Sequence, residues 1–96
     1  MGRILVVDDC EAWREAVCRL IETQPELQVV AQATNGFEAV RLAEELKPDL
    51  VVLDIGLSLD GLNAAARIFE VSPTSKVSFL SLENDPIDQA AALYVH

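Results

Sequence analysis

The chain has 96 residues, of which 51% are hydrophobic and 24% charged, so we expect one folded domain with a single core. Its formal net charge of −9 argues against direct binding to nucleic acid or to an anionic membrane surface, because both need clustered Lys and Arg side chains. No apolar run approaches the roughly 18 residues of a membrane span, and residues 1–3 lead into a strand rather than a signal peptide. The cytoplasm is therefore the expected compartment.

The first half of the chain alternates between strand-like and helix-like segments. Residues 3–7 (RILVV) form a run rich in β-branched residues and leucine, without alternation of apolar and polar residues. Such a run is typical of a strand covered on both faces. Apolar residues then recur at the 3.6 period from residue 11, which predicts a helix that ends near Pro25. Residues 27–33 predict a second strand, and Thr34-Asn35-Gly36 supplies a turn before a second helix that Pro48 ends.

The second half continues this alternation. Residues 49–54 predict a third strand, Gly61 opens a helix that Ser72-Pro73 ends, and residues 76–80 and 93–95 predict two more strands. Strands separated by amphipathic helices indicate βαβ units and a parallel sheet with right-handed crossovers. Residues 82–92 are close to the shortest workable parallel crossover, so we expect either a stub of helix there or missing residues.

Three carboxylates follow the ends of two apolar strands: Asp8 and Asp9 after the first, and Asp54 after the third. Ligands bind beyond the carboxyl ends of parallel strands, so these acids should meet at one edge of the sheet. One such Asp is commonly only a helix cap, whereas the combination predicts a negative pocket suited to Mg²⁺. One acid could then attack a phosphoryl donor, and the Ser81 hydroxyl could hydrogen-bond a phosphoryl oxygen.

Four stretches, two of which contain these acids, form a pattern typical of a known family: residues 4–9 (ILVVDD), 48–55 (PDLVVLDI), 61–62 (GL) and 76–81 (KVSFLS). Together they resemble the receiver domain of bacterial two-component response regulators, over nearly the whole chain. The resemblance implies a flavodoxin-like α/β fold with a doubly wound parallel sheet of five strands in the order 2-1-3-4-5. It also implies a role for each matching residue: Asp54 as phosphoacceptor, Asp8 and Asp9 as metal-binding acids, the Gly56 carbonyl as a further metal ligand, Ser81 as switch hydroxyl and Tyr94 as switch aromatic.

The resemblance extends to partners. Residues 61–65 (GLNAA), 79–81 (FLS) and 94–96 (YVH) resemble most the receivers that precede a LuxR-type helix-turn-helix, which implies transcriptional control through a DNA-binding domain outside these residues. The family implies a histidine kinase as phosphoryl donor, Mg²⁺ as cofactor and homodimerisation through the fourth helix, fourth strand and fifth helix. The domain would be a substrate that assists its own phosphorylation, without being a turnover enzyme.

The chain departs from the family pattern around the phosphorylation crevice. After Asp54 a proline is absent and Gly61 arrives one residue early, and the stretch between Pro86 and Tyr94 is short. The lysine and the fifth helix that should follow Tyr94 are absent. We therefore expect residues 1–96 to form a single, C-terminally incomplete receiver domain with a shortened fourth helix, and we hypothesise that the encoded protein has the missing residues.

Three other functions fit parts of the pattern. A pseudo-receiver that binds its partner without phosphorylation fits the missing lysine, although the complete acid set argues against it. A phosphatase with an aspartate nucleophile would resemble Asp-x-Asp, whereas Asp54-Ile55-Gly56 lacks the second acid. A flavodoxin-like electron carrier would need a phosphate-cradling loop after Val7, where this chain has acids.

Overall fold

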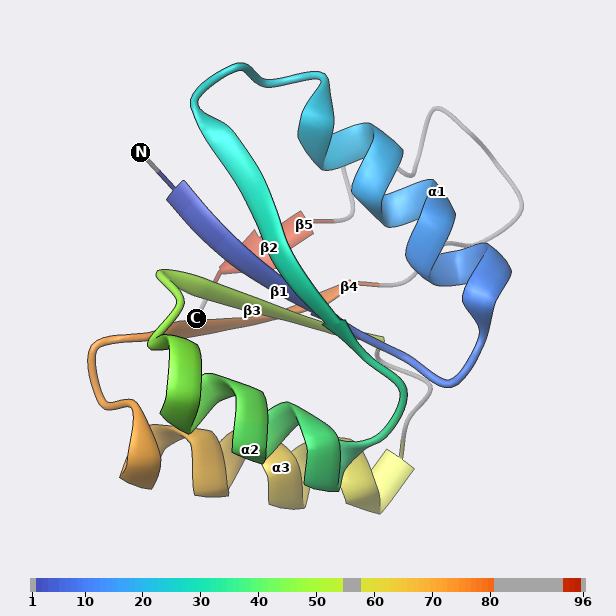
Figure 1. Ribbon diagram of the computed structural model, residues 1–96. Coiled ribbons are helices and arrows are strands. Elements are labelled where there is room, and N and C mark those ends of the chain that lie inside the picture. Colours follow the sequence, from blue (N-terminus) through green and yellow to red (C-terminus); the bar gives the residue numbers. More distant parts are fainter. Residues whose placement is uncertain (1, 55–57, 81–92, 96) are drawn as a thin grey trace.

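The computed structural model describes the backbone of residues 2–54, 58–80 and 93–95, and the side chains of residues 2–54 and 61–80. Strands and helices alternate along the chain as predicted (Figure 1). The elements are β1 (Gly2–Val7), α1 (Glu11–Glu22), β2 (Leu27–Ala33), α2 (Gly36–Leu46), β3 (Leu50–Asp54), α3 (Ser58–Val71), β4 (Lys76–Leu80) and β5 (Leu93–Val95).

The strands form one sheet in the order β2-β1-β3-β4-β5, which confirms the predicted order and fold class. Strands β1 to β4 are parallel to their neighbours, whereas β5 pairs antiparallel with β4 and places Tyr94 opposite Phe79. The expectation of a fully parallel sheet was therefore wrong for the fifth strand. A parallel neighbour needs a crossover of a dozen or more residues that usually includes a helix, and residues 81–92 are at that lower limit.

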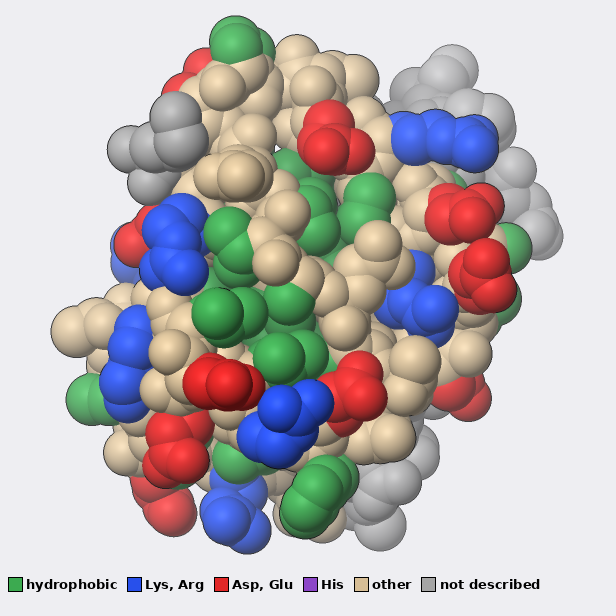
Figure 2. All heavy atoms as spheres, in the orientation of Figure 1, with side chains coloured by type: hydrophobic (Ala, Val, Ile, Leu, Met, Phe, Trp, Pro, Cys, Tyr) green, Lys and Arg blue, Asp and Glu red, His purple; other side chains and the backbone are tan. Residues whose placement is uncertain are grey.

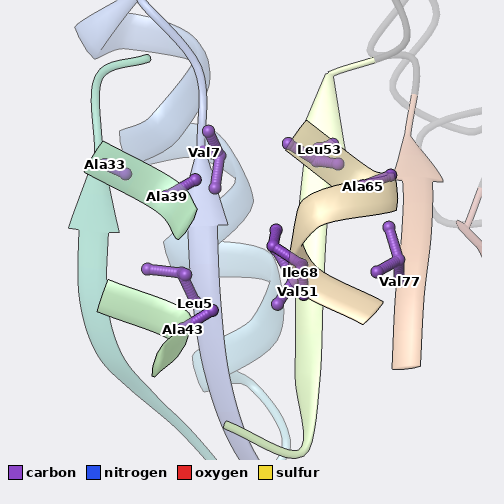
Figure 3. Close-up of a cluster of buried hydrophobic side chains, with 10 residues drawn as sticks. All are labelled: Leu5, Val7, Ala33, Ala39, Ala43, Val51, Leu53, Ala65, Ile68 and Val77. Carbon is purple, nitrogen blue, oxygen red and sulfur yellow. The ribbon is translucent and has the colours of Figure 1, made fainter. Parts of the chain in front are cut away.

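Helices cover both faces of the sheet (Figure 1). On one face, α2 and α3 lie side by side over a buried cluster in which the strands supply the larger side chains and the helices supply mainly alanines (Figure 3). Small helical residues let the helices approach the strands closely, while each fully buried Leu, Val or Ile contributes about 1.5–3 kcal/mol. The residues are Leu5, Val7, Ala33, Ala39, Ala43, Val51, Leu53, Ala65, Ile68 and Val77.

The opposite face of the sheet is covered by α1, whose buried side chains pack against β1, β3 and β4. This second cluster consists of Ile4, Val6, Val17, Cys18, Ile21, Val52 and Leu80. Figure 2 shows hydrophobic side chains in the middle of the molecular face over β2, between α1 and α2, with charged side chains around them. Most of β2 is only half-buried, as expected for a strand at the edge of a sheet.

Local sequence signals fix the start and end of α2. The Asn35 side chain accepts a hydrogen bond from the Glu38 N–H at 2.8 Å, and the Glu38 carboxylate accepts one from the Thr34 N–H at 3.1 Å. The first bond satisfies a free donor in the first turn of the helix, and the second satisfies the N–H of the residue before the cap. Lys47 ends the helix in the left-handed region, at φ 46°. By contrast, α3 begins at Ser58, three residues before the predicted Gly61, because glycine does not prevent a helix from extending through it.

The ends of the strands define two edges of the sheet: the amino edge, where β1, β3 and β4 begin, and the carboxyl edge, where they end. At the amino edge, the Arg3 guanidinium donates hydrogen bonds to the carbonyls of Leu46 at 2.8 Å and Lys47 at 3.1 Å. The Arg3 N–H donates to the Asp49 carboxylate at 2.8 Å. One arginine therefore joins the start of β1 to the end of α2 and to the turn before β3.

Serine hydroxyls continue this network at the start of β4. The Ser75 hydroxyl donates to the Pro48 carbonyl, and it is also hydrogen-bonded to the Ser72 hydroxyl at 2.6 Å. The Lys47 ammonium donates to the Val71 carbonyl at the end of α3. Both serines are buried, so these bonds satisfy polar groups that water does not reach.

Two expectations cannot be compared with this fold. The shortened fourth helix falls on residues 81–92, outside the described residues, and the missing fifth helix concerns sequence beyond residue 96. Among the described residues, no helix has both the length and the apolar character needed to cross a bilayer.

Candidate functional site

Strand register brings two of the predicted acids together at the carboxyl edge. In the parallel pairing of β1 with β3, Val7 lies opposite Leu53, so Asp8 and Asp54 are neighbours one residue further along. Successive side chains of a strand point to opposite faces. Because Val6 and Val52 belong to the cluster under α1, the two acids share that side of the sheet.

The Asp8 carboxyl lies in an unfavourable place for a negative charge. The residue is 2% exposed, and burial raises the pKa of Asp8 above its usual range. A hydrogen bond from the Cys10 N–H at 2.9 Å acts in the opposite direction, whereas a hydrogen bond with the Asp54 carboxyl and the charges of Asp54 and Asp9 add to the increase. A cation bound beside Asp8 would therefore offset both its burial and the neighbouring negative charge.

Asp9, the third predicted acid, is exposed at the start of the turn into α1. No hydrogen bond to its carboxylate is formed within residues 2–54 and 61–80. Its orientation depends on the peptide unit that it shares with Asp8, because a peptide unit is planar. The backbone on the Asp8 side of this unit is held by hydrogen bonds, including one from the Asp8 N–H to the Ala33 carbonyl at 3.1 Å.

The sequence analysis did not single out Arg14, a residue of the first helix, as part of the site. The Arg14 Nη1 donates to the Asp8 carbonyl at 2.7 Å, and its Nε donates to the Gln32 side chain at 3.0 Å. A long cation one turn into the helix that follows an acidic turn is a signal that could have indicated this contact. Gln32, on the edge strand β2, carried no such signal.

The donor chemistry of the Asp8 and Asp54 pair fits Mg²⁺. This cation accepts one or two protein carboxylates, keeps several waters and completes its shell with phosphate oxygens. Burial is the main cause of the raised pKa of Asp8, and a divalent cation would favour the charged carboxylate and offset the repulsion from Asp54 and Asp9 that adds to it. Across residues 2–54 and 61–80, no three Asp, Glu, His or Cys side chains are gathered around one point, so two acids form the preassembled part of the site.

The other predicted site residues lie where the structure gives no side chain. Gly56 and Ser81 are outside the described residues. Ser81 follows Leu80, which pairs with Asp54 across β3 and β4. The backbone of Tyr94 lies in β5, and its side chain is outside the described part. The roles predicted for these three residues therefore stay predictions.

Comparison with known proteins identifies the group to which this geometry is similar. Residues 4–96 match the family described as response regulator receiver domain. A protein-glutamate methylesterase/protein-glutamine glutaminase of Aliivibrio fischeri is 40% identical over 84 residues, which cover 86% of this chain and 22% of that protein. The chain thus spans about a fifth of the length of this curated relative.

Two solved structures are similar in fold as well. The response regulator domain of Thermotoga maritima CheB has a TM-score of 0.76 and 36% identity, over 95% of this chain and 70% of that one. A LuxR-family two-component response regulator of Aurantimonas has a TM-score of 0.78 and 33% identity, over 96% and 66% of the two chains. The predicted likeness to LuxR-type receivers is confirmed, and an equally close likeness exists to a receiver of another class.

Proposed function

The chain belongs to the response regulator receiver domain family, and on that premise we propose that it accepts a phosphoryl group on Asp54 and signals through the change that follows. The observation that carries this proposal is the pairing of Asp8 with Asp54 at the carboxyl edge, where burial raises the pKa of Asp8 and the neighbouring acids add to the increase. Such a pair has more to gain from a cation and a phosphoryl donor than isolated surface acids have.

The proposed reaction is a single phosphoryl transfer. An Asp54 carboxylate oxygen forms a bond to phosphorus while the bond between phosphorus and the donor breaks, and that electron pair leaves with the donor. The donor is a phosphorylated histidine of a kinase, or a small acyl phosphate in vitro. The domain is a substrate of this transfer rather than a turnover enzyme, and its contribution is to position Asp54 and to neutralise charge.

Mg²⁺ is the proposed cofactor, with Asp8 and Asp54 as ligands and with Asp9 and the Gly56 carbonyl completing the protein donors. When bound, it supplies positive charge for the phosphoryl oxygens. Asp8 contributes a buried carboxylate whose backbone is fixed on both sides, by Ala33 and Arg14. This anchoring supports a ligand role because it limits the reorganisation needed on binding.

Phosphorylation with acetyl phosphate tests the proposal directly. In the presence of Mg²⁺, the intact mass should increase by one phosphate, and Asp54→Asn should remove that increase. Asp49→Asn is the matched control, because it neutralises an exposed aspartate of the same strand region at the opposite edge. A folded Asp54→Asn variant that still gains the phosphate would contradict the assignment. A folded wild-type chain that gains none would favour the phosphorylation-independent pseudo-receiver.

The output of this switch is also part of the proposal. We infer a histidine kinase as donor, Ser81 and Tyr94 as the residues that report the phosphate, and a partner or output domain as the receiver of the signal. The similarity to both a LuxR-family regulator and a CheB receiver supports two kinds of output, transcriptional control and regulation of an attached enzyme. Homodimerisation, a single-domain organisation of residues 1–96 and a cytoplasmic location belong to the same proposal.

A further inference from the structure

Arg14 connects the turn that carries the acids to a different strand of the sheet. Its side chain leaves the first turns of α1 and reaches the Asp8 carbonyl through Nη1, at 2.7 Å. Through Nε it reaches the Gln32 amide oxygen on β2, at 3.0 Å. The planar guanidinium holds these two donors in a fixed relation, so the position of each acceptor restrains the other.

The bond is made to the backbone carbonyl of Asp8 and leaves its carboxylate available. That carbonyl belongs to the peptide unit between Asp8 and Asp9, whose atoms lie in one plane. Fixing the oxygen therefore fixes the direction in which the chain enters Asp9. The Asp9 carboxylate is exposed and accepts no hydrogen bond in the described part of the molecule, so Asp9 is positioned through its backbone. The peptide unit before it is held by Arg14, and the peptide unit after it is held by the bond from the Cys10 N–H to the Asp8 carboxylate.

The other side of Asp8 is held independently. Its N–H donates to the Ala33 carbonyl at 3.1 Å, and its carboxylate accepts from the Cys10 N–H at 2.9 Å. Removing Arg14 would therefore leave these two bonds in place and remove the side-chain hydrogen bond that fixes the carbonyl of the Asp8–Asp9 peptide unit. The substitution would change the orientation of Asp9 and of the turn after β1, and β1 itself would stay folded.

We propose that Arg14 is a positioning residue of the acidic site, which orients the Asp8–Asp9 peptide unit so that both acids face one cation. This inference rests on the proposed function, since it assumes that the acids bind Mg²⁺. Groups that orient metal ligands typically change metal affinity by about 10–100-fold when they are removed. The proposal extends the site from the carboxylates to α1 and, through Gln32, to the edge strand β2.

The test is a calorimetric titration of the whole chain with Mg²⁺. Arg14→Gln should weaken binding about tenfold. Arg19→Gln is the control, because it removes the same charge from an exposed position on the same helix and should change the affinity by less than about twofold. Arg14→Lys keeps the charge and one donor, so its affinity should lie between those of Arg14→Gln and the wild type. Circular dichroism establishes that each variant is folded at the temperature of the titration.

Four results would overturn the role of Arg14. Equal weakening by Arg14→Gln and Arg19→Gln would reduce it to a charge effect, and unchanged binding in Arg14→Gln would remove it. If Arg14→Gln does not fold, Gln32→Leu replaces it, because that change frees one end of the guanidinium at constant net charge; wild-type affinity in this variant would overturn the proposal. A wild-type chain without any Mg²⁺ binding would overturn the proposed function as well. Failure of the Arg14 role alone would instead leave Mg²⁺ binding by the wild type intact.

Discussion

At the amino edge of the sheet, polar groups that become buried are hydrogen-bonded to neighbouring segments, whereas at the carboxyl edge two acids face each other. Arg3 joins the start of β1 to the end of α2, and Ser75 joins the start of β4 to the turn before β3. Asp8 and Asp54 lie at the other end of the same strands, and burial and like charge raise the pKa of Asp8. One edge therefore stabilises the fold, while the other holds a buried acid whose charged form is unfavourable in the absence of a ligand.

The largest change in the free energy of unfolding should come from Ser75→Ala at the amino edge. The change leaves the Pro48 carbonyl and the Ser72 hydroxyl buried without this partner, so we expect a loss of about 2 kcal/mol in the free energy of unfolding, measured with urea. Thr74→Ala, at the exposed neighbouring position, is the control. Mg²⁺ affinity should be unchanged in both, and a loss of affinity in folded Ser75→Ala would show that the two edges are coupled.

At the carboxyl edge, a substitution should increase the free energy of unfolding instead of lowering it. Asp8→Asn removes a buried acid beside Asp54, so the metal-free domain should become more stable by about 1 kcal/mol, or roughly 4–8 °C in Tm for a domain of this size. Addition of Mg²⁺ should raise the Tm of the wild type more than that of the variant. A decrease in stability on substitution would mean that the Asp8 carboxyl is a net stabiliser, and the contrast between the edges would fail.

The pH dependence sharpens this point. The pKa of Asp8 is raised in the folded state above its usual value of 3.8, so the folded state holds the proton more tightly than the unfolded state. The stability contributed by protonated Asp8 is present below that value and is lost as the pH rises through the raised pKa. In metal-free buffer, the advantage of Asp8→Asn over the wild type should therefore increase from about pH 4 upward and then level off. A constant difference between about pH 4 and pH 8 would contradict the assignment.

The smallest effect is expected at Trp13, in the first turn of α1. Its indole N–H is buried without a hydrogen-bond partner among the described residues, and its ring packs against the cluster under α1. Trp13→Phe loses ring contacts and also removes the unsatisfied donor, so the two effects should nearly cancel, within about 1 kcal/mol. Thermal unfolding measures the outcome. A loss of several kcal/mol would show that the donor has a partner in solution.

The sequence allowed the acidic pair to be predicted because apolar runs mark where buried strands end. The runs before Asp8 and Asp54 are both continuous, so their ends could be placed to the residue and their meeting followed from parallel topology. The direction of β5 could not be found in this way, because a run of three strand-like residues carries no information about which way it points. The start of α3 was misjudged because Gly61 was taken as a boundary.

Arg14 was missed for another reason: its position one turn into the helix indicates that it can reach the acidic turn, but not which atoms it contacts. Its contact depends on the course of the turn after β1 and on the side-chain conformation, neither of which leaves a periodic pattern. Asp9 illustrates the same limit. The sequence places it next to Asp8, but the exposure of one and the burial of the other depend on where the strand gives way to the turn.

The pairing of β1 with β3 limits which insertions and deletions the sequence can accept during evolution. Their register is regular from Ile4 and Leu50 to Val7 and Leu53, in contrast to the irregularity between β1 and β2. A single-residue insertion or deletion within β3 would turn Asp54 to the opposite face of the sheet, away from Asp8, even if the fold survived. The number of residues in β3 up to Asp54 therefore determines whether the two acids meet. The short run from Leu50 to Asp54 should tolerate substitutions far better than changes in length.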